Sequence, residues 1–160
     1  AAKLTAASVG LGRTHYDPAL RLYEQLDQLL SGNIPADLPA PNTEASLDEF
    51  APRGKLMKRM QRADDWLKAN TGTEGDLQSE SEQARHEALM IALLATVTAE
   101  KKYDMADEPE YRTQAKALIE ASRAAAEAAQ KNDFAAFSTA RENMTKACTA
   151  CHLDFRFDEE

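Results

Sequence analysis

The chain has 160 residues, enough for one domain with a buried core, and a formal net charge of −8. Because nucleic acids and anionic membrane surfaces attract basic proteins, this charge argues against both as partners and favours a basic one. No stretch approaches the roughly 18 apolar residues of a membrane span. The low aromatic content of 6% and the small number of glycines favour helices over sheet.

Residues 1–47 are predicted to form an N-terminal extension with one helix and a linker. The helix starts at Asp17, a capping residue followed by a proline, and its apolar stripe ends before Gly32. Three prolines within residues 33–47 indicate the linker. The main domain is then residues 48–160.

Four further helices are predicted in the main domain, so that the fold is all-α. The first spans about residues 52–70 and the third about residues 107–131, with small side chains on its inner stripe. The second begins at a capping box formed by Ser79 and Glu82 and runs to about residue 103. Its centre is apolar nearly all round, which predicts the most enclosed helix.

The last helix is predicted to start at Asp133. Its inward residues recur at steps of three and four and include both cysteines of the chain: Phe134, Phe137, Arg141, Met144, Cys148, Cys151 and Phe155. A cofactor attached to the cysteines would therefore lie inside the helical domain, where bundles build such sites.

The most specific motif is Cys148-Thr149-Ala150-Cys151-His152, the attachment signature of a c-type haem. Each cysteine can form a thioether to a haem vinyl group, and His152 is placed to ligate the iron. On a helix the three side chains emerge within an arc of about 100°. Two alternatives are a disulfide or free dithiol, which normally lies beside a strand–helix unit, and a zinc site, which would need two more ligands.

The last third of the chain resembles the class II c-type cytochromes, which comprise cytochrome c′ and its low-spin relatives. The resemblance rests on Ala125-Ala-Glu-Ala-Ala-Gln-Lys-Asn-Asp-Phe134 and on Cys148-Thr-Ala-Cys-His-Leu-Asp-Phe-Arg156. It covers about residues 107–157, extends less closely over 50–103, and is absent over 1–47. It implies an antiparallel four-helix bundle with one covalently attached haem c near the C-terminus.

The resemblance also implies further site residues. Members of the family carry, on the first bundle helix, an arginine that pairs with a haem propionate and, four residues later, the residue that faces the open side of iron. Arg53 and Met57 match these positions, and a methionine ligand is typical of the low-spin relatives. Met60 would ligate instead if the register shifted by a turn, and either methionine could be a core filler. Arg156 would lie near the imidazole of His152.

A rival interpretation makes the helix at residues 17–31 the first bundle helix, with His15 or Tyr16 near the haem. We expect His15 in an exposed loop and His86 on a polar flank, so neither histidine is the favoured ligand.

The leading functional prediction is one-electron transfer by a non-enzymatic carrier that docks to a redox partner with a basic surface. Covalent haem implies export, so we take the chain as a mature form without its leader and predict a periplasmic location. One alternative is a five-coordinate, cytochrome c′-like protein that binds nitric oxide and carbon monoxide. Another is a haem-free helical interaction module with a disulfide. Family members often pair through their first two helices, so monomer and homodimer both stay open.

Overall fold

A computed structural model describes residues 13–30 and 51–155, which form six helices and no strand. The chain divides into two compact units, Ala1–Pro52 and Arg53–Glu160. The prediction of an all-α fold is thereby confirmed for the described residues. None of the described helices is long and apolar enough to cross a membrane. The predicted linker at residues 33–47 lies outside the described residues.

The described part of the first unit is helix α2 (Arg13–Leu30). The predicted start at Asp17 was wrong, because the helix begins four residues earlier and continues through Pro18. Pro18 lies in the second turn, so its missing N–H removes only the hydrogen bond to the carbonyl of Thr14. The predicted loop around His15 was therefore also wrong, and this residue lies within α2.

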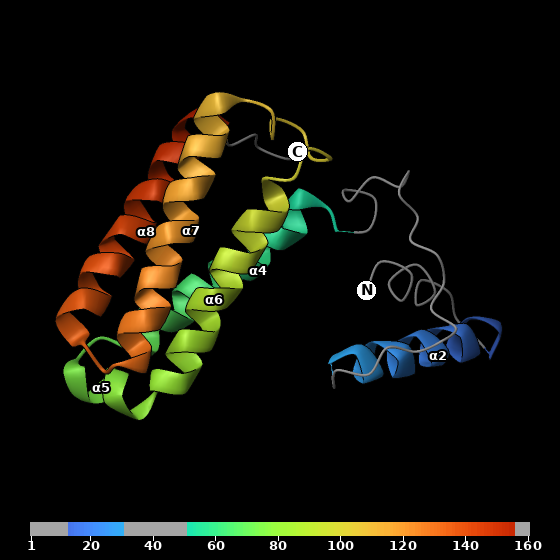
Figure 1. Ribbon diagram of the computed structural model, residues 1–160, viewed down its shortest axis with the longest axis horizontal. Coiled ribbons are helices and arrows are strands. Elements are labelled where there is room, and N and C mark those ends of the chain that lie inside the picture. Colours follow the sequence, from blue (N-terminus) through green and yellow to red (C-terminus); the bar gives the residue numbers. More distant parts are fainter. Residues whose placement is uncertain (1–12, 31–50, 156–160) are drawn as a thin grey trace. The chain divides into compact units, whose positions relative to one another are not determined.

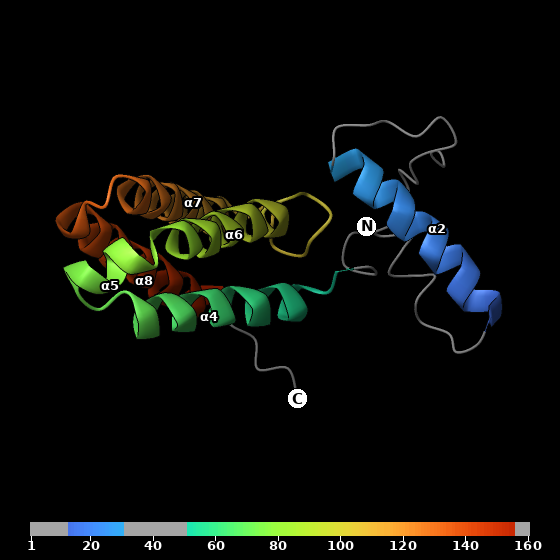
Figure 2. The same cartoon turned by 90° about the horizontal axis from the view of Figure 1, so that it is seen from below.

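The second unit contains four long helices and one short one. Figure 1 shows α8, α7 and α6 side by side, and Figure 2 shows α4 running beneath α6. Their bounds are α4 (Arg53–Asn70), α5 (Glu74–Ser79), α6 (Ser81–Thr98), α7 (Pro109–Gln130) and α8 (Phe134–Phe155). Helix α4 packs against α6, α6 against α7, and α7 against α8. The backbones of α8 and α4 lie farther apart than those of these three pairs.

The predicted bounds of α4 and α7 and the predicted start of α8 are confirmed to within two residues. Pro109 occupies the first turn of α7, where its missing N–H costs no helical hydrogen bond. Asp133 caps α8, since its side chain accepts a hydrogen bond from the backbone N–H of Ala136 at 3.0 Å. Asn132, just before it, has a positive φ of 54°, which makes the sharp turn from α7 into α8.

The core of the second unit combines a few large side chains with many alanines. Phe137 and Leu67 are among its largest fully buried side chains. Small residues on the inner stripe of α7 let the neighbouring helices approach closely. Its buried residues are Tyr111, Ala115, Ala121, Ser122, Ala125, Ala126, Ala128 and Ala129.

The predicted capping box of Ser79 and Glu82 was wrong, because a short helix precedes α6. Thr73 and Asp76 form the capping box instead, at the start of α5. Ser79 is the last residue of α5, and its hydroxyl donates to the carbonyl of Gly75 at 3.1 Å. The serine side chain is therefore committed to α5 and cannot cap the helix that follows.

The predicted length of α6 was wrong, whereas its predicted enclosure agrees with the structure: seven of its 18 residues are buried, a larger share than in α4, α5, α7 or α8. The helix ends at Thr98, and the turns that follow bury Tyr103 and Ala106 at the end of the domain. Leu89 and Leu93 are 38% and 57% exposed. Because α6 packs against α4 on one side and α7 on the other, these two leucines, one turn apart, lie on its remaining face.

Candidate cofactor site

A cavity of about 690 Å³ lies in the second unit, and all four long helices contribute to its lining. From α8 come Cys148, Cys151 and His152, and from α4 come Met57 and Met60. The volume falls within the range of roughly 300–1,000 Å³ that is typical of small-molecule and cofactor pockets. The fold thus brings the cysteine–histidine motif and both candidate methionines to one cavity.

The inner wall of this cavity is apolar. Ile91 and Ala95 come from α6, and Ala115 and Leu118 come from α7. Alanines on the wall leave space that larger side chains would fill, and the backbones of α8 and α4 lie farther apart than those of the other neighbouring long helices. A flat apolar ring system could enter here without displacing the core.

The two thiols are free and half-buried in the last turns of α8. Burial, together with the nearby carboxylate of Asp64 and the second thiol, raises the pKa of Cys148 to about 11, although Lys68 opposes the shift. Burial also raises the pKa of Cys151, with Arg53 opposing. Redox-active dithiols need the opposite shift, so this environment disfavours the dithiol alternative.

A zinc site would require further ligands beside the cysteines. Over residues 13–30 and 51–155, no group of three or more His, Cys, Asp and Glu side chains could hold a metal ion. His152 itself is exposed in the last turn of α8 and lines the cavity. Its ring is therefore available to a ligand in the cavity and not committed to the core.

Arg53 is a fixed positive charge at the end of the cavity where α4 begins. Its guanidinium lies over the rings of Tyr103 and Tyr111, at 5.6 and 5.0 Å from their centroids. It also donates a hydrogen bond to the carbonyl of Asp104. Tyr111 is held in turn by a hydrogen bond from its hydroxyl to the carbonyl of Thr98 at 3.2 Å. The arginine can therefore present its charge in a constant position.

The same end of the cavity is closed by two aromatic rings. Tyr111 of α7 and Phe155 of α8 meet edge to face, with their ring centroids 5.5 Å apart. The resemblance predicts Arg53 as a site residue, but its contact with Tyr103 and Tyr111 was not predicted. No local signal could have predicted it, because the contact depends on how the turns after α6 fold back onto α4.

The two methionines differ in their surroundings. Met60 is 7% exposed and belongs to the hydrophobic core, whereas Met57 is half-buried at the edge of that core. Met57 lies one turn after Arg53 on the same side of α4. Met57 can therefore turn its sulfur into the cavity at a smaller cost in core packing than Met60.

The remaining candidates from the sequence are Arg156, His86 and Tyr16. Arg156 is outside the described residues. His86 is exposed on α6, as expected, and lines a separate polar pocket with Glu80, Glu82 and Gln83. Tyr16 is an exposed residue of α2 in the first unit. His86 is not among the described residues that line the cavity.

Comparison with protein-family models gave no match, and comparisons with curated proteins and with solved structures gave no significant match. The interpretation of the site therefore depends on its own residues and on the resemblance of the motif.

Proposed function

We propose that the protein is a monohaem c-type cytochrome that transfers single electrons in the periplasm. In this proposal the second unit is a four-helix bundle of the class II cytochrome kind, and the haem lies in the cavity between α8 and α4. The observation that carries the proposal is the shared lining of this cavity by Cys148, Cys151 and His152 from one helix and by Met57 from another.

The residues of the cavity fit a haem c. The two free thiols, three residues apart on one helical face, would hold the group through thioethers to its vinyl side chains. The imidazole of His152 would donate to the iron, and the apolar wall suits the face of a porphyrin. Arg53, held between two tyrosines, would pair with a propionate. Bound haem supplies reversible one-electron chemistry at its iron.

We assign the distal position to Met57 and keep Met60 as the alternative. A thioether ligand favours the ferrous state and raises the reduction potential, and the apolar wall acts in the same direction by excluding water. With His152 on one side and Met57 on the other, no coordination position would stay open for a substrate. This arrangement supports a carrier and not an enzyme.

The test is to express the chain behind a secretion signal in a host that carries out cytochrome c maturation. We expect a coloured protein whose mass exceeds that of the polypeptide by one haem, and which keeps that haem after acid–acetone extraction. The ferric spectrum should be low-spin and should show a thioether-to-iron band, and carbon monoxide should leave the ferrous spectrum unchanged.

Substitution of the motif supplies the matched controls. Cys148→Ser and Cys151→Ser should each give a protein with a single thioether and lower stability, whereas the double variant should retain no haem after extraction. A high-spin ferric spectrum, with carbon monoxide bound on reduction, would support the gas-binding alternative. A colourless protein with the mass of the bare polypeptide would contradict both.

A further inference from the structure

Helix α4 is positively charged in an acidic protein. It contains six basic residues and two acidic ones, a net charge of +4, while the whole chain has −8. No other described helix has a net positive charge. The charge of α4 therefore opposes that of the rest of the molecule, and α4 forms one wall of the cavity.

Three of the basic residues of α4 share its outward face. Lys55, Lys58 and Arg62 are exposed, and at about 100° per residue their side chains emerge within an arc of roughly 60°. Within residues 13–30 and 51–155, no ion pair engages any of the three. We refer to Lys55, Lys58 and Arg62 as the basic face.

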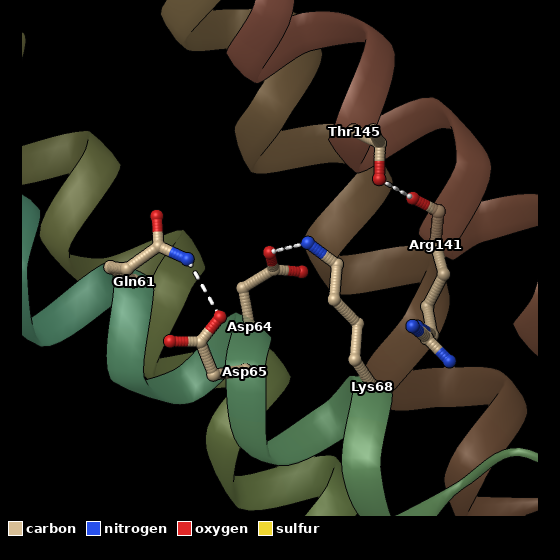
Figure 3. Close-up of polar contacts among 6 residues, drawn as sticks. All are labelled: Gln61, Asp64, Asp65, Lys68, Arg141 and Thr145. Atoms are coloured by element: carbon tan, nitrogen blue, oxygen red, sulfur yellow. Dashed lines mark hydrogen bonds and ion pairs between the residues drawn. The ribbon is translucent and has the colours of Figure 1, made fainter.

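The other charges of α4 are largely engaged within the protein. Arg59 pairs with the buried carboxylate of Glu87 at 2.8 Å. Figure 3 shows Asp64 paired with Lys68 and Asp65 accepting a hydrogen bond from Gln61. The two acidic side chains are therefore directed along the helix to local partners, and neither of them pairs with a cation of the basic face.

The basic face adjoins the cavity that holds the proposed site. Lys58 itself lines the cavity, and Lys55 and Arg62 lie one turn before and one turn after it. A protein docked on the basic face would approach the cavity from the side of α4. Because electron transfer requires close approach to the redox centre, this is a suitable place for an electron-transfer partner.

We propose that the basic face of α4 is the docking surface for an acidic redox partner protein. This inference rests on the proposed function for the identity of the cavity's occupant. The net charge of −8 predicts a basic partner, but the charge nearest the cavity has the opposite sign, and local charge governs the final orientation of a complex. Three cations over about 10 Å of helix suit a small acidic patch, whereas a nucleic acid or an anionic membrane would be repelled by the rest of the molecule.

The experiment follows oxidation of the reduced holoprotein by two small probes of opposite charge, ferricyanide and tris(phenanthroline)cobalt(III). Ferricyanide oxidation should slow by about tenfold as the ionic strength rises from about 10 mM to about 0.3 M, because salt screens an attraction. Oxidation by the cobalt complex should not slow in this way. If the net charge governed the approach, ferricyanide would instead react faster at high salt, and the proposal would fail.

Two double variants separate the basic face from the net charge. Lys55→Glu with Arg62→Glu should lower the ferricyanide rate at low salt by about tenfold. The control, Lys116→Glu with Arg123→Glu, makes the same change of charge at exposed positions of α7, away from the cavity. It should change the rate by less than about twofold. Equal effects of the two double variants would overturn the proposal.

A second measurement does not depend on haem. Titration of the ¹⁵N-labelled protein with hexaglutamate should shift amide signals of residues 55–62 more than any others, and the shifts should disappear at high salt. If the protein were colourless and the shifts still occurred, the proposed function would fail, and the basic face would stand as a docking surface for an acidic partner. Shifts spread over the molecule, or co-sedimentation with phosphatidylglycerol vesicles or duplex DNA at about 0.1 M salt, would overturn the assignment to an acidic protein.

Discussion

The surroundings of Cys148 keep its thiol protonated and weakly nucleophilic. It lies near the end of a helix, where the dipole disfavours an anion, and the carboxylate of Asp64 adds to the effect of burial on its pKa. A cysteine in such surroundings resists oxidation and disulfide exchange. The environment therefore suits a cysteine that serves as a covalent anchor.

This environment predicts slow alkylation in the haem-free Cys151→Ser chain, where Cys148 is the only thiol. Burial and the carboxylate of Asp64, the two largest causes of its raised pKa, remain in this variant, so its reaction with iodoacetamide at pH 9 should be at least about tenfold slower than in the urea-unfolded chain. Because the unfolded state releases this proton first, the free energy of unfolding should fall as the pH rises from about 9 to about 11. A folded-state pKa near 7 would instead support a redox dithiol.

Substitution of Met57 and of Met60 tests which of the two methionines is the ligand in the proposed haem site. Met57→Ala should convert the ferric spectrum to high spin and lower the reduction potential, since Met57 is the proposed ligand. Met60→Ala should leave the spectrum low-spin but lower the free energy of unfolding by about 2–4 kcal/mol, because Met60 is a core residue. Visible spectra and urea unfolding of both variants provide the measurement. A high-spin spectrum in Met60→Ala alone would identify Met60, one turn after Met57, as the ligand.

Helix α5 shows how a short element is stabilised by its first turn. The hydroxyl of Thr73 accepts a hydrogen bond from the backbone N–H of Asp76 at 3.2 Å, and the carboxylate of Asp76 accepts one from the backbone N–H of Thr73 at 3.0 Å. The helix also buries Leu77 completely. The capping box therefore positions a core side chain as well as satisfying the helix end.

Removal of this cap should have a measurable effect. We expect Thr73→Ala to lower the free energy of unfolding by about 1 kcal/mol, because it leaves a backbone donor of α5 without its acceptor. Ser79→Ala should change stability by less than about 0.5 kcal/mol, since the hydroxyl of Ser79 only bonds back to its own helix. Urea denaturation followed by circular dichroism measures both. A larger loss in Ser79→Ala would restore the capping role expected from the sequence.

The helix boundaries show which elements can be predicted from the sequence. The starts of α4, α7 and α8 follow from Pro52, Pro109 and Asp133, and each helix has a regular inner stripe. Helix α5 was missed because its six residues are too few to show periodicity. The exposure of Leu93 was not predicted either, because the apolar pattern at the centre of α6 does not show how many faces of this helix pack against neighbouring helices.

At the scale of the whole molecule, the candidate site depends on the pairing of helices far apart in the chain. The motif at Cys148 to His152 was identified from local spacing, and Met57 and Arg53 from a resemblance. The inner stripe of small residues on α7, which includes Ala115, was predicted from its periodicity, but no local pattern shows that Ile91 of α6 also lines the cavity. The residue types of the candidate site could be predicted from the sequence, but the shape of the cavity could not.

The position of the core predicts that the second unit folds by itself. Every member of the described core cluster lies between Met57 and Met144, and all described residues that line the cavity lie between Arg53 and Phe155. A chain of residues 53–160, exported and matured in the same way as the full chain, should therefore keep the same visible spectrum and potential. Its urea midpoint should match that of the full chain, since the described core cluster is retained whole. Loss of folding or a changed spectrum would show that residues 1–52 contribute to the haem domain, and it would favour the rival interpretation in which the helix at residues 17–31 is the first of the bundle.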